Sequence, residues 1–100
     1  MVQQYLPFQN SHISYYRFGT GNKLIFAFHG YSNDAHVFDL LQPLLQNDYT
    51  FIAIDLPIHG GTRWRNGLFT TSKLKRIIDS IILQENLSKQ YSLLGFSLGG

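Results

Sequence analysis

The chain has 100 residues, which is enough for one small domain and too few for two. Only 14% of the residues are charged, about half the usual share, while 44% are hydrophobic, so we expect the chain to be part of a larger body. The net charge is +2 and no basic stripe occurs, which argues against a nucleic-acid partner. The chain has no Cys and therefore no disulfide, and it has no apolar run long enough to span a membrane. We therefore expect a cytoplasmic protein.

The first predicted elements alternate between strand and helix, which is typical of the α/β class. An aromatic and β-branched run at 13–18 predicts a strand that ends at a glycine turn. The apolar run 24–28 predicts a central strand covered on both faces. A helix is expected after a cap at Asn33 or Asp34, and Pro43 should kink this helix or end it early.

The second half of the chain continues the same alternation. Residues 51–54 predict a second buried strand, and the turn-forming residues of 55–69 predict a long surface loop. The clearest helix follows, because apolar residues repeat at helical spacing at Leu74, Ile77, Ile78, Ile81 and Ile82. Residues 91–94 predict a third buried strand, which leads directly into a glycine-rich end.

That glycine-rich end, Gly95-Phe96-Ser97-Leu98-Gly99, fits the pattern G-x-S-x-G. In this pattern a serine occupies a sharp turn between a strand and a helix, with its hydroxyl raised above the sheet. Glycine is required two positions before and after the serine because other backbone approaches there and leaves no room for a Cβ. An ordinary glycine-rich turn is the alternative interpretation of the pattern taken alone.

Three segments, in this order, resemble the α/β-hydrolase family: His29-Gly30-Tyr31, the stretch 55–62 and the turn around Ser97. The second segment is similar to the family's D-x-P-G-H-G-x-S loop, with Ile58 in place of the usual glycine and Thr62 in place of the usual serine. The resemblance extends over residues 13–100. It implies a mostly parallel sheet flanked by helices, with residues 1–100 as the N-terminal part of a single domain.

The resemblance implies a serine hydrolase that acts on a small-molecule ester, thioester or related carbonyl substrate. Ser97 would be the nucleophile, and the backbone N–H groups of Tyr31 and Leu98 would form the oxyanion hole. The family's triad runs in the order Ser, acid, His, but all four histidines of this chain precede Ser97. The later strands, the cap, the acid and the histidine are therefore expected beyond residue 100, and the 100 residues alone are expected to be inactive.

The other motif residues are expected to support the turns rather than to react: His29, Gly30, Asp55, His59, Gly60, Gly95 and Gly99. His36, at a helix start, stays open as a residue that faces the active site, and Trp64 stays open between a pocket wall and a contact with a partner. No cofactor or metal is implied, because no dinucleotide, phosphate-loop or zinc pattern occurs. The alternative function is a non-catalytic family member that keeps the fold and binds a small molecule or a protein.

Overall fold

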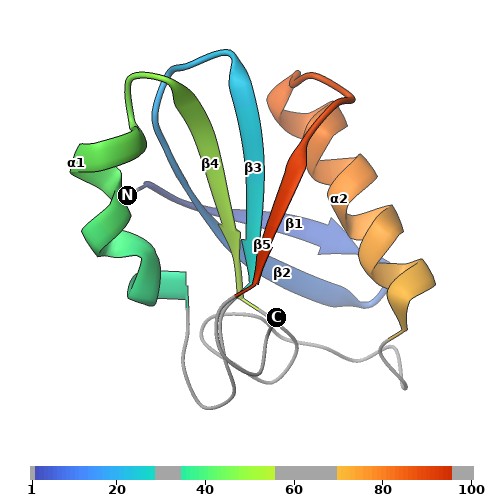
Figure 1. Ribbon diagram of the computed structural model, residues 1–100. Helices are drawn as coiled ribbons and strands as arrows, with labels where there is room; N and C mark the ends of the chain where they lie inside the picture. Colours follow the sequence, from blue (N-terminus) through green and yellow to red (C-terminus); the bar gives the residue numbers. More distant parts are fainter. Residues whose placement is uncertain (1, 29–34, 56–69, 96–100) are drawn as a thin grey trace.

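A computed structural model describes residues 2–28, 35–55 and 70–95, which form a five-stranded sheet with helices on both faces (Figure 1). The strands are β1 (Val2–Phe8), β2 (Ser11–Phe18), β3 (Lys23–Phe28), β4 (Tyr49–Ile54) and β5 (Ser92–Gly95), in the spatial order β1-β2-β4-β3-β5. β3 pairs in parallel with β4 and β5, whereas β2 pairs antiparallel with β1 and β4. The predicted α/β class is confirmed, but the sheet is mixed rather than mostly parallel.

The hairpin of β1 and β2 causes this mixed character, and its first strand was missed by the sequence analysis. Two residues, Gln9 and Asn10, connect the strands, and Gln9 has a positive φ of 54°. Only Leu6 and Phe8 of β1 are buried. Two apolar residues that alternate with polar ones at the end of the strand are too few to predict the whole strand.

A tight glycine turn connects β2 to β3 and packs against the segment that enters β4. Gly19 has a φ of 87°, and a Cβ at this position would collide with the carbonyl oxygen of Tyr49. A Cβ at Gly21 would collide with the backbone of Asp48. Glycine is required at both positions because no side chain fits between these two stretches of backbone.

The helix expected after residue 34 is split into two short pieces, the 3-10 helix η1 (Ala35–Leu41) and the α-helix α1 (Gln42–Leu45). Pro43 lies in the first turn of α1, where its missing N–H leaves no hydrogen bond unmade. The helix type therefore changes just before this proline, and the α-helix continues past it to Leu45 rather than ending at it. The cap expected at Asn33 or Asp34 lies outside the described residues.

The clearest predicted helix is confirmed as α2 (Thr71–Glu85), with its four isoleucines buried. The side chain of Thr70 caps its start by accepting a hydrogen bond from the Lys73 N–H at 3.2 Å. Asn86 ends the helix in the left-handed conformation, and the Leu87 N–H then donates to the Ile82 carbonyl at 2.9 Å. None of the described helices is long and apolar enough to cross a membrane.

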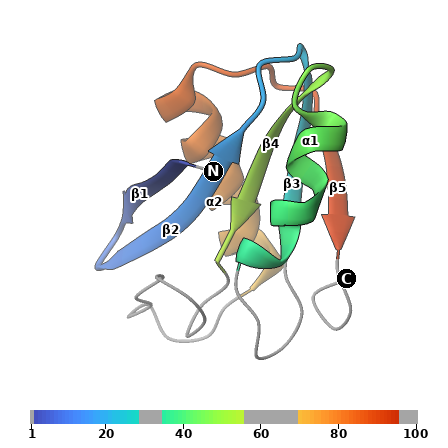
Figure 2. The same ribbon diagram turned by 90° about the vertical axis from the view of Figure 1, so that its left-hand side faces the viewer.

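The two faces of the sheet are covered by different helices, as Figure 2 shows from the side. On one face α2 packs against Phe26 and Phe28 of β3 and against the hairpin. On the other face Phe38 of η1 packs against Ala27 of β3 and Phe51 of β4. The prediction that 24–28 is a strand covered on both faces is confirmed.

Within the part of the chain that the structure describes, β5 is an exposed edge strand, which contradicts the prediction of a third buried strand. All four of its residues are exposed, with Leu93 at 61% and Leu94 at 37%. Within the described residues β5 pairs only with β3. An apolar run can thus predict that a strand forms, but its burial depends on the elements that cover it.

Candidate active site

The candidate site lies at the edge of the sheet where the parallel strands β3, β4 and β5 end (Figure 1). Phe28, the last residue of β3, is the register partner of both Ile54 in β4 and Gly95 in β5. The three motif segments begin at or directly after these residues. Ligand sites of open α/β sheets form outside the carboxyl ends of the strands, so the sheet brings the starts of all three segments to the usual place.

Asp55, the first residue after β4, is a described site residue that is fully buried. Its exposed fraction is 0%, and its backbone N–H donates a hydrogen bond to the Ser14 carbonyl at 2.9 Å. A buried carboxylate is costly unless it is hydrogen-bonded, and no buried side-chain N or O atom of the described residues lacks a partner. Asp55 is thus held firmly at the end of β4 by burial and by hydrogen bonds.

Gly95 is the second described site residue and the last residue of β5. It lies beside Phe28 at the end of the sheet, one residue before the serine turn begins. The structure therefore supplies the strand that a nucleophile turn requires before it. The remaining predicted site residues lie outside the described residues: His29, Gly30, Tyr31, His59, Gly60, Ser97, Leu98 and Gly99.

Two residues that the sequence analysis did not single out hold the ends of the segment 55–70. The Ser14 carbonyl accepts the Asp55 N–H at one end, and the Thr70 side chain caps α2 at the other. Figure 1 shows that α2 begins on the side of the sheet where β3 and β4 end. A threonine before a periodic run is a known cap signal, but a backbone carbonyl such as that of Ser14 leaves no trace in the residue pattern.

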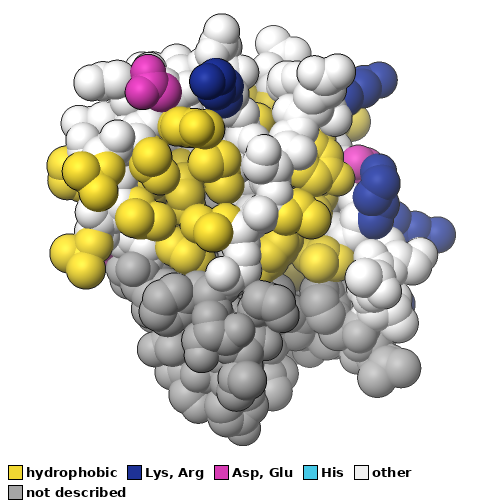
Figure 3. Space-filling view, viewed as in Figure 1, with side chains coloured by type: hydrophobic (Ala, Val, Ile, Leu, Met, Phe, Trp, Pro, Cys, Tyr) yellow, Lys and Arg dark blue, Asp and Glu magenta, His cyan; other side chains and the backbone are white. Residues whose placement is uncertain are grey.

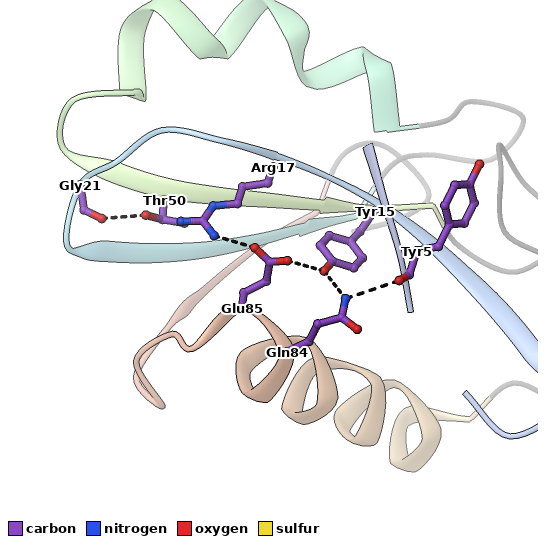
Figure 4. Close-up of polar contacts among 7 residues, drawn as sticks. All are labelled: Tyr5, Tyr15, Arg17, Gly21, Thr50, Gln84 and Glu85. Atoms are coloured by element: carbon purple, nitrogen blue, oxygen red, sulfur yellow. Dashed lines mark hydrogen bonds and ion pairs between the residues drawn. The ribbon is translucent and has the colours of Figure 1, made fainter. Parts of the chain in front are cut away.

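A polar cluster at the opposite end of α2 joins this helix to β2 (Figure 4). The Tyr15 hydroxyl donates to Glu85 Oε2 at 2.7 Å, and Arg17 Nη1 donates to Glu85 Oε1 at 2.6 Å. Gln84 Nε2 donates to the Tyr15 hydroxyl at 2.6 Å. Burial, followed by the bond to Glu85, raises the pKa of Tyr15 well above its usual range. This cluster joins the helix to the sheet away from the candidate site.

The described residues offer no group of three or more His, Cys, Asp or Glu that would hold a metal ion. Among the described residues, the pKa is raised for Tyr15 in the cluster above and for Lys75 on α2. The Lys75 pKa is raised because its ammonium donates to both carboxylate oxygens of Asp79 at 3.0 Å. The Tyr15 shift is thus caused mainly by burial and the Lys75 shift by its pairing with Asp79, so both are explained within the fold.

Comparison with known proteins places the chain in a family. The family model of the alpha/beta hydrolase fold matches residues 23–100. A serine hydrolase-like protein of Danio rerio is 32% identical over 82 residues, which cover 76% of this chain and 24% of that protein. The chain thus spans about a quarter of the length of this curated relative.

Solved structures share the architecture at low sequence identity. The Cif epoxide hydrolase from Acinetobacter nosocomialis superposes with a TM-score of 0.81 at 19% identity, over 98% of this chain and 31% of its own. The thioesterase domain from the curacin biosynthetic pathway superposes with a TM-score of 0.75 at 24% identity, over 99% of this chain and 38% of its own. Likeness at this identity shows the fold, and the family model covers all three motif segments. The chain belongs to the alpha/beta hydrolase fold family.

Proposed function

We propose that this chain carries the nucleophile of a serine hydrolase that cleaves a small-molecule ester, thioester or related carbonyl substrate. The observation that carries the proposal is the pattern Gly95-Phe96-Ser97-Leu98-Gly99 directly after β5, at the edge where β3 and β4 also end. The family membership of the chain supports a hydrolase. The name of the Danio rerio relative, serine hydrolase-like protein, supports a serine as the reacting group.

In the proposed reaction the Ser97 Oγ forms a bond to the acyl carbon while its proton passes to a histidine base. The bond to the leaving group then breaks, and the base returns the proton to the leaving oxygen or sulfur. Water attacks the acyl-enzyme by the same proton route and releases the acid. The N–H groups of Tyr31 and Leu98 would stabilise the negative carbonyl oxygen, and each would lower the barrier by about 3 kcal/mol.

The proposal places the histidine base and its acidic partner in polypeptide that follows residue 100 in the intact protein. The histidines of this chain all precede Ser97, whereas the family's order puts the base after the serine. We propose accordingly that residues 1–100 are the N-terminal part of one hydrolase domain and are inactive alone. This chain matches 38% and 31% of the length of the two solved structures, which supports its being one part of a longer domain.

The identity of residue 97 favours acyl transfer over the other chemistries of the family. Relatives that open epoxides or remove halides use aspartate at the nucleophile position, and this chain has serine there. The likeness to the Acinetobacter epoxide hydrolase concerns the fold at 19% identity, so it does not extend to the substrate. An acyl carbon is the electrophile that an activated serine hydroxyl attacks.

A covalent serine probe tests the proposal on the intact protein. A fluorophosphonate should label Ser97 alone, as mapped by peptide mass spectrometry, because only an activated serine reacts readily. Ser97→Ala should abolish labelling and lower turnover of small activated esters by several orders of magnitude. Ser92→Ala is the matched control, because this exposed serine lies in β5 just before the motif and should leave labelling and turnover unchanged.

Esterase activity that survives Ser97→Ala in a folded protein would show that the nucleophile is assigned wrongly. An intact protein that ignores the probe, hydrolyses no acyl substrate and lacks an acid and a histidine after residue 100 would favour the alternative. That alternative is a family member that keeps the fold and binds a small molecule or a protein.

A further inference from the structure

The first sixteen residues of the chain contain no Asp, Glu, Lys or Arg, so all of the charged residues lie after them. This stretch forms β1, the hairpin turn and most of β2. The first charge along the chain is that of Arg17, which is already paired with Glu85 at 2.6 Å. The outer strand of the hairpin therefore presents an electrically neutral surface.

β1 is an edge strand of the sheet, as Figure 2 shows. It pairs with β2 from Val2↔Arg17 to Phe8↔Ser11 in an unbroken register, without a bulge. No other strand of the described residues pairs with its outer side. Because backbone groups of alternate residues point away from the partner strand, this side carries hydrogen-bonding groups that another strand can pair with. The Tyr5 carbonyl already accepts a hydrogen bond from Gln84 Nε2 of α2 at 3.4 Å, and its second lone pair is left for a further donor.

Edge strands of natural proteins are usually protected by charges, prolines, bulges or short length. β5, at the other edge of the sheet that the described residues form, has 4 residues and is therefore short. β1 has 7 residues, and its one protecting feature is Pro7 near its end. Val2 and Tyr5 are 61% and 53% exposed. Residues 2–6 thus form a regular and uncharged edge, in which Leu6 is buried and the other side chains are partly or fully exposed.

We propose that β1 is a homodimer interface in which the β1 strands of two copies pair antiparallel about a two-fold axis at Gln4. Pro7 has no N–H to donate, so the pairing is confined to residues 2–6, and Gln4 is the middle of that segment. Gln4 then lies opposite the partner's Gln4, and Gln3 lies opposite the partner's Tyr5. The two sheets become one continuous sheet.

A second copy fits this edge for two reasons. A two-fold arrangement brings the same surface of both copies together, and the absence of charge in β1 means that no like charges meet there. The net charge of +2 per chain adds little repulsion at a distance in salt. Five paired residues bury a small area, so the dimer is weak and depends on concentration.

Charge substitution at Gln4, followed by sedimentation of the intact protein over a concentration series, tests the interface. Gln4→Lys and Gln4→Glu should each weaken dimerisation about fivefold or more, because like charges then lie directly opposite each other. An equimolar mixture of the two variants should dimerise again, because opposite charges meet. Leu40→Lys is the matched control: it adds the same charge at a side chain that is 85% exposed on η1, and should leave dimerisation unchanged.

A wild-type protein that stays monomeric throughout would overturn the proposal, as would a Gln4→Lys variant that dimerises like the wild type. Two folded monomeric variants whose mixture stays monomeric would overturn it as well. If either variant fails to fold, amide hydrogen exchange of the wild type decides the question. Amides of residues 2–6 should exchange more slowly as the concentration rises, and an unchanged rate would refute the pairing.

Discussion

The two faces of the sheet differ in how completely a helix covers them. On one face α2 buries Ile77, Ile78, Ile81 and Ile82 against the sheet and the hairpin. On the other face η1 and α1 bury Phe38, while Leu40 and Leu44 stay 85% and 75% exposed. Figure 3 shows a broad group of apolar side chains at the surface on this second side.

The regularity of each helix explains the difference. α2 keeps apolar residues at helical spacing over 15 residues, so one stripe faces the sheet along its whole length. The helix type changes from η1 to α1 just before Pro43, so no single helical period runs through both, and Leu40 and Leu44 are exposed. We therefore expect the stability of this region to come mainly from the α2 face.

The largest loss of unfolding free energy is expected from a substitution in the core between α2 and the sheet. Ile81 is 0% exposed, so Ile81→Ala should lower the free energy of unfolding by about 2–5 kcal/mol through lost burial and a cavity. Leu44→Ala on the other face, at a side chain that is 75% exposed, should change it by less than about 0.5 kcal/mol. Urea denaturation of the intact protein measures both values. Equal losses would contradict the comparison.

A smaller effect is expected where the hairpin is tied to α2. Tyr15→Phe removes the hydroxyl that donates to Glu85 and accepts from Gln84, and should lower the free energy of unfolding by about 1–2 kcal/mol at neutral pH. Burial raises the pKa of Tyr15 above its ordinary value of 10.0. The folded protein therefore keeps this proton at a pH where the unfolded chain has lost it.

The stabilisation from Tyr15 is thus fully present below about pH 10 and is lost as the pH rises further. Above that pH, one retained proton makes the free energy of unfolding fall by up to about 1.4 kcal/mol per pH unit. Tyr15→Phe should show a slope that is shallower by this amount in urea denaturation between neutral and alkaline pH. Identical slopes for the variant and the wild type would show that Tyr15 contributes nothing to the pH dependence.

The smallest change in unfolding free energy is expected from a substitution that stabilises the turn between β1 and β2, the hairpin that packs against α2. Gln9 has a φ of 54°, a conformation that glycine adopts without strain, so Gln9→Gly should raise the free energy of unfolding by about 0.5–1 kcal/mol. Asn10→Gly is the matched control, because Asn10 does not have a positive φ and glycine relieves nothing there. Thermal melts of both variants measure the difference. A gain from Asn10→Gly as large as that from Gln9→Gly would rule out backbone strain as the cause.

Local patterns were sufficient for part of the fold and of the candidate site. The isoleucine spacing predicted α2, and the apolar runs predicted β3 and β4, because each pattern repeats with the period of its element. Pro43 predicted that the segment after residue 34 is no single regular helix, and the helix type changes just before it. The spacing of Gly95, Ser97 and Gly99 likewise predicts a nucleophile turn from residues that are close in the chain.

The sequence by itself thus determined the elements whose patterns are local, together with the order of the three motif segments. Only the tertiary structure decided that β1 joins the sheet, that β5 is an exposed edge and that the Asp55 N–H bonds to the Ser14 carbonyl. The order β1-β2-β4-β3-β5 is what brings the ends of β3, β4 and β5 to one edge. Such pairings join backbone groups far apart in the chain, and burial against distant neighbours selects them, so no local residue pattern records them.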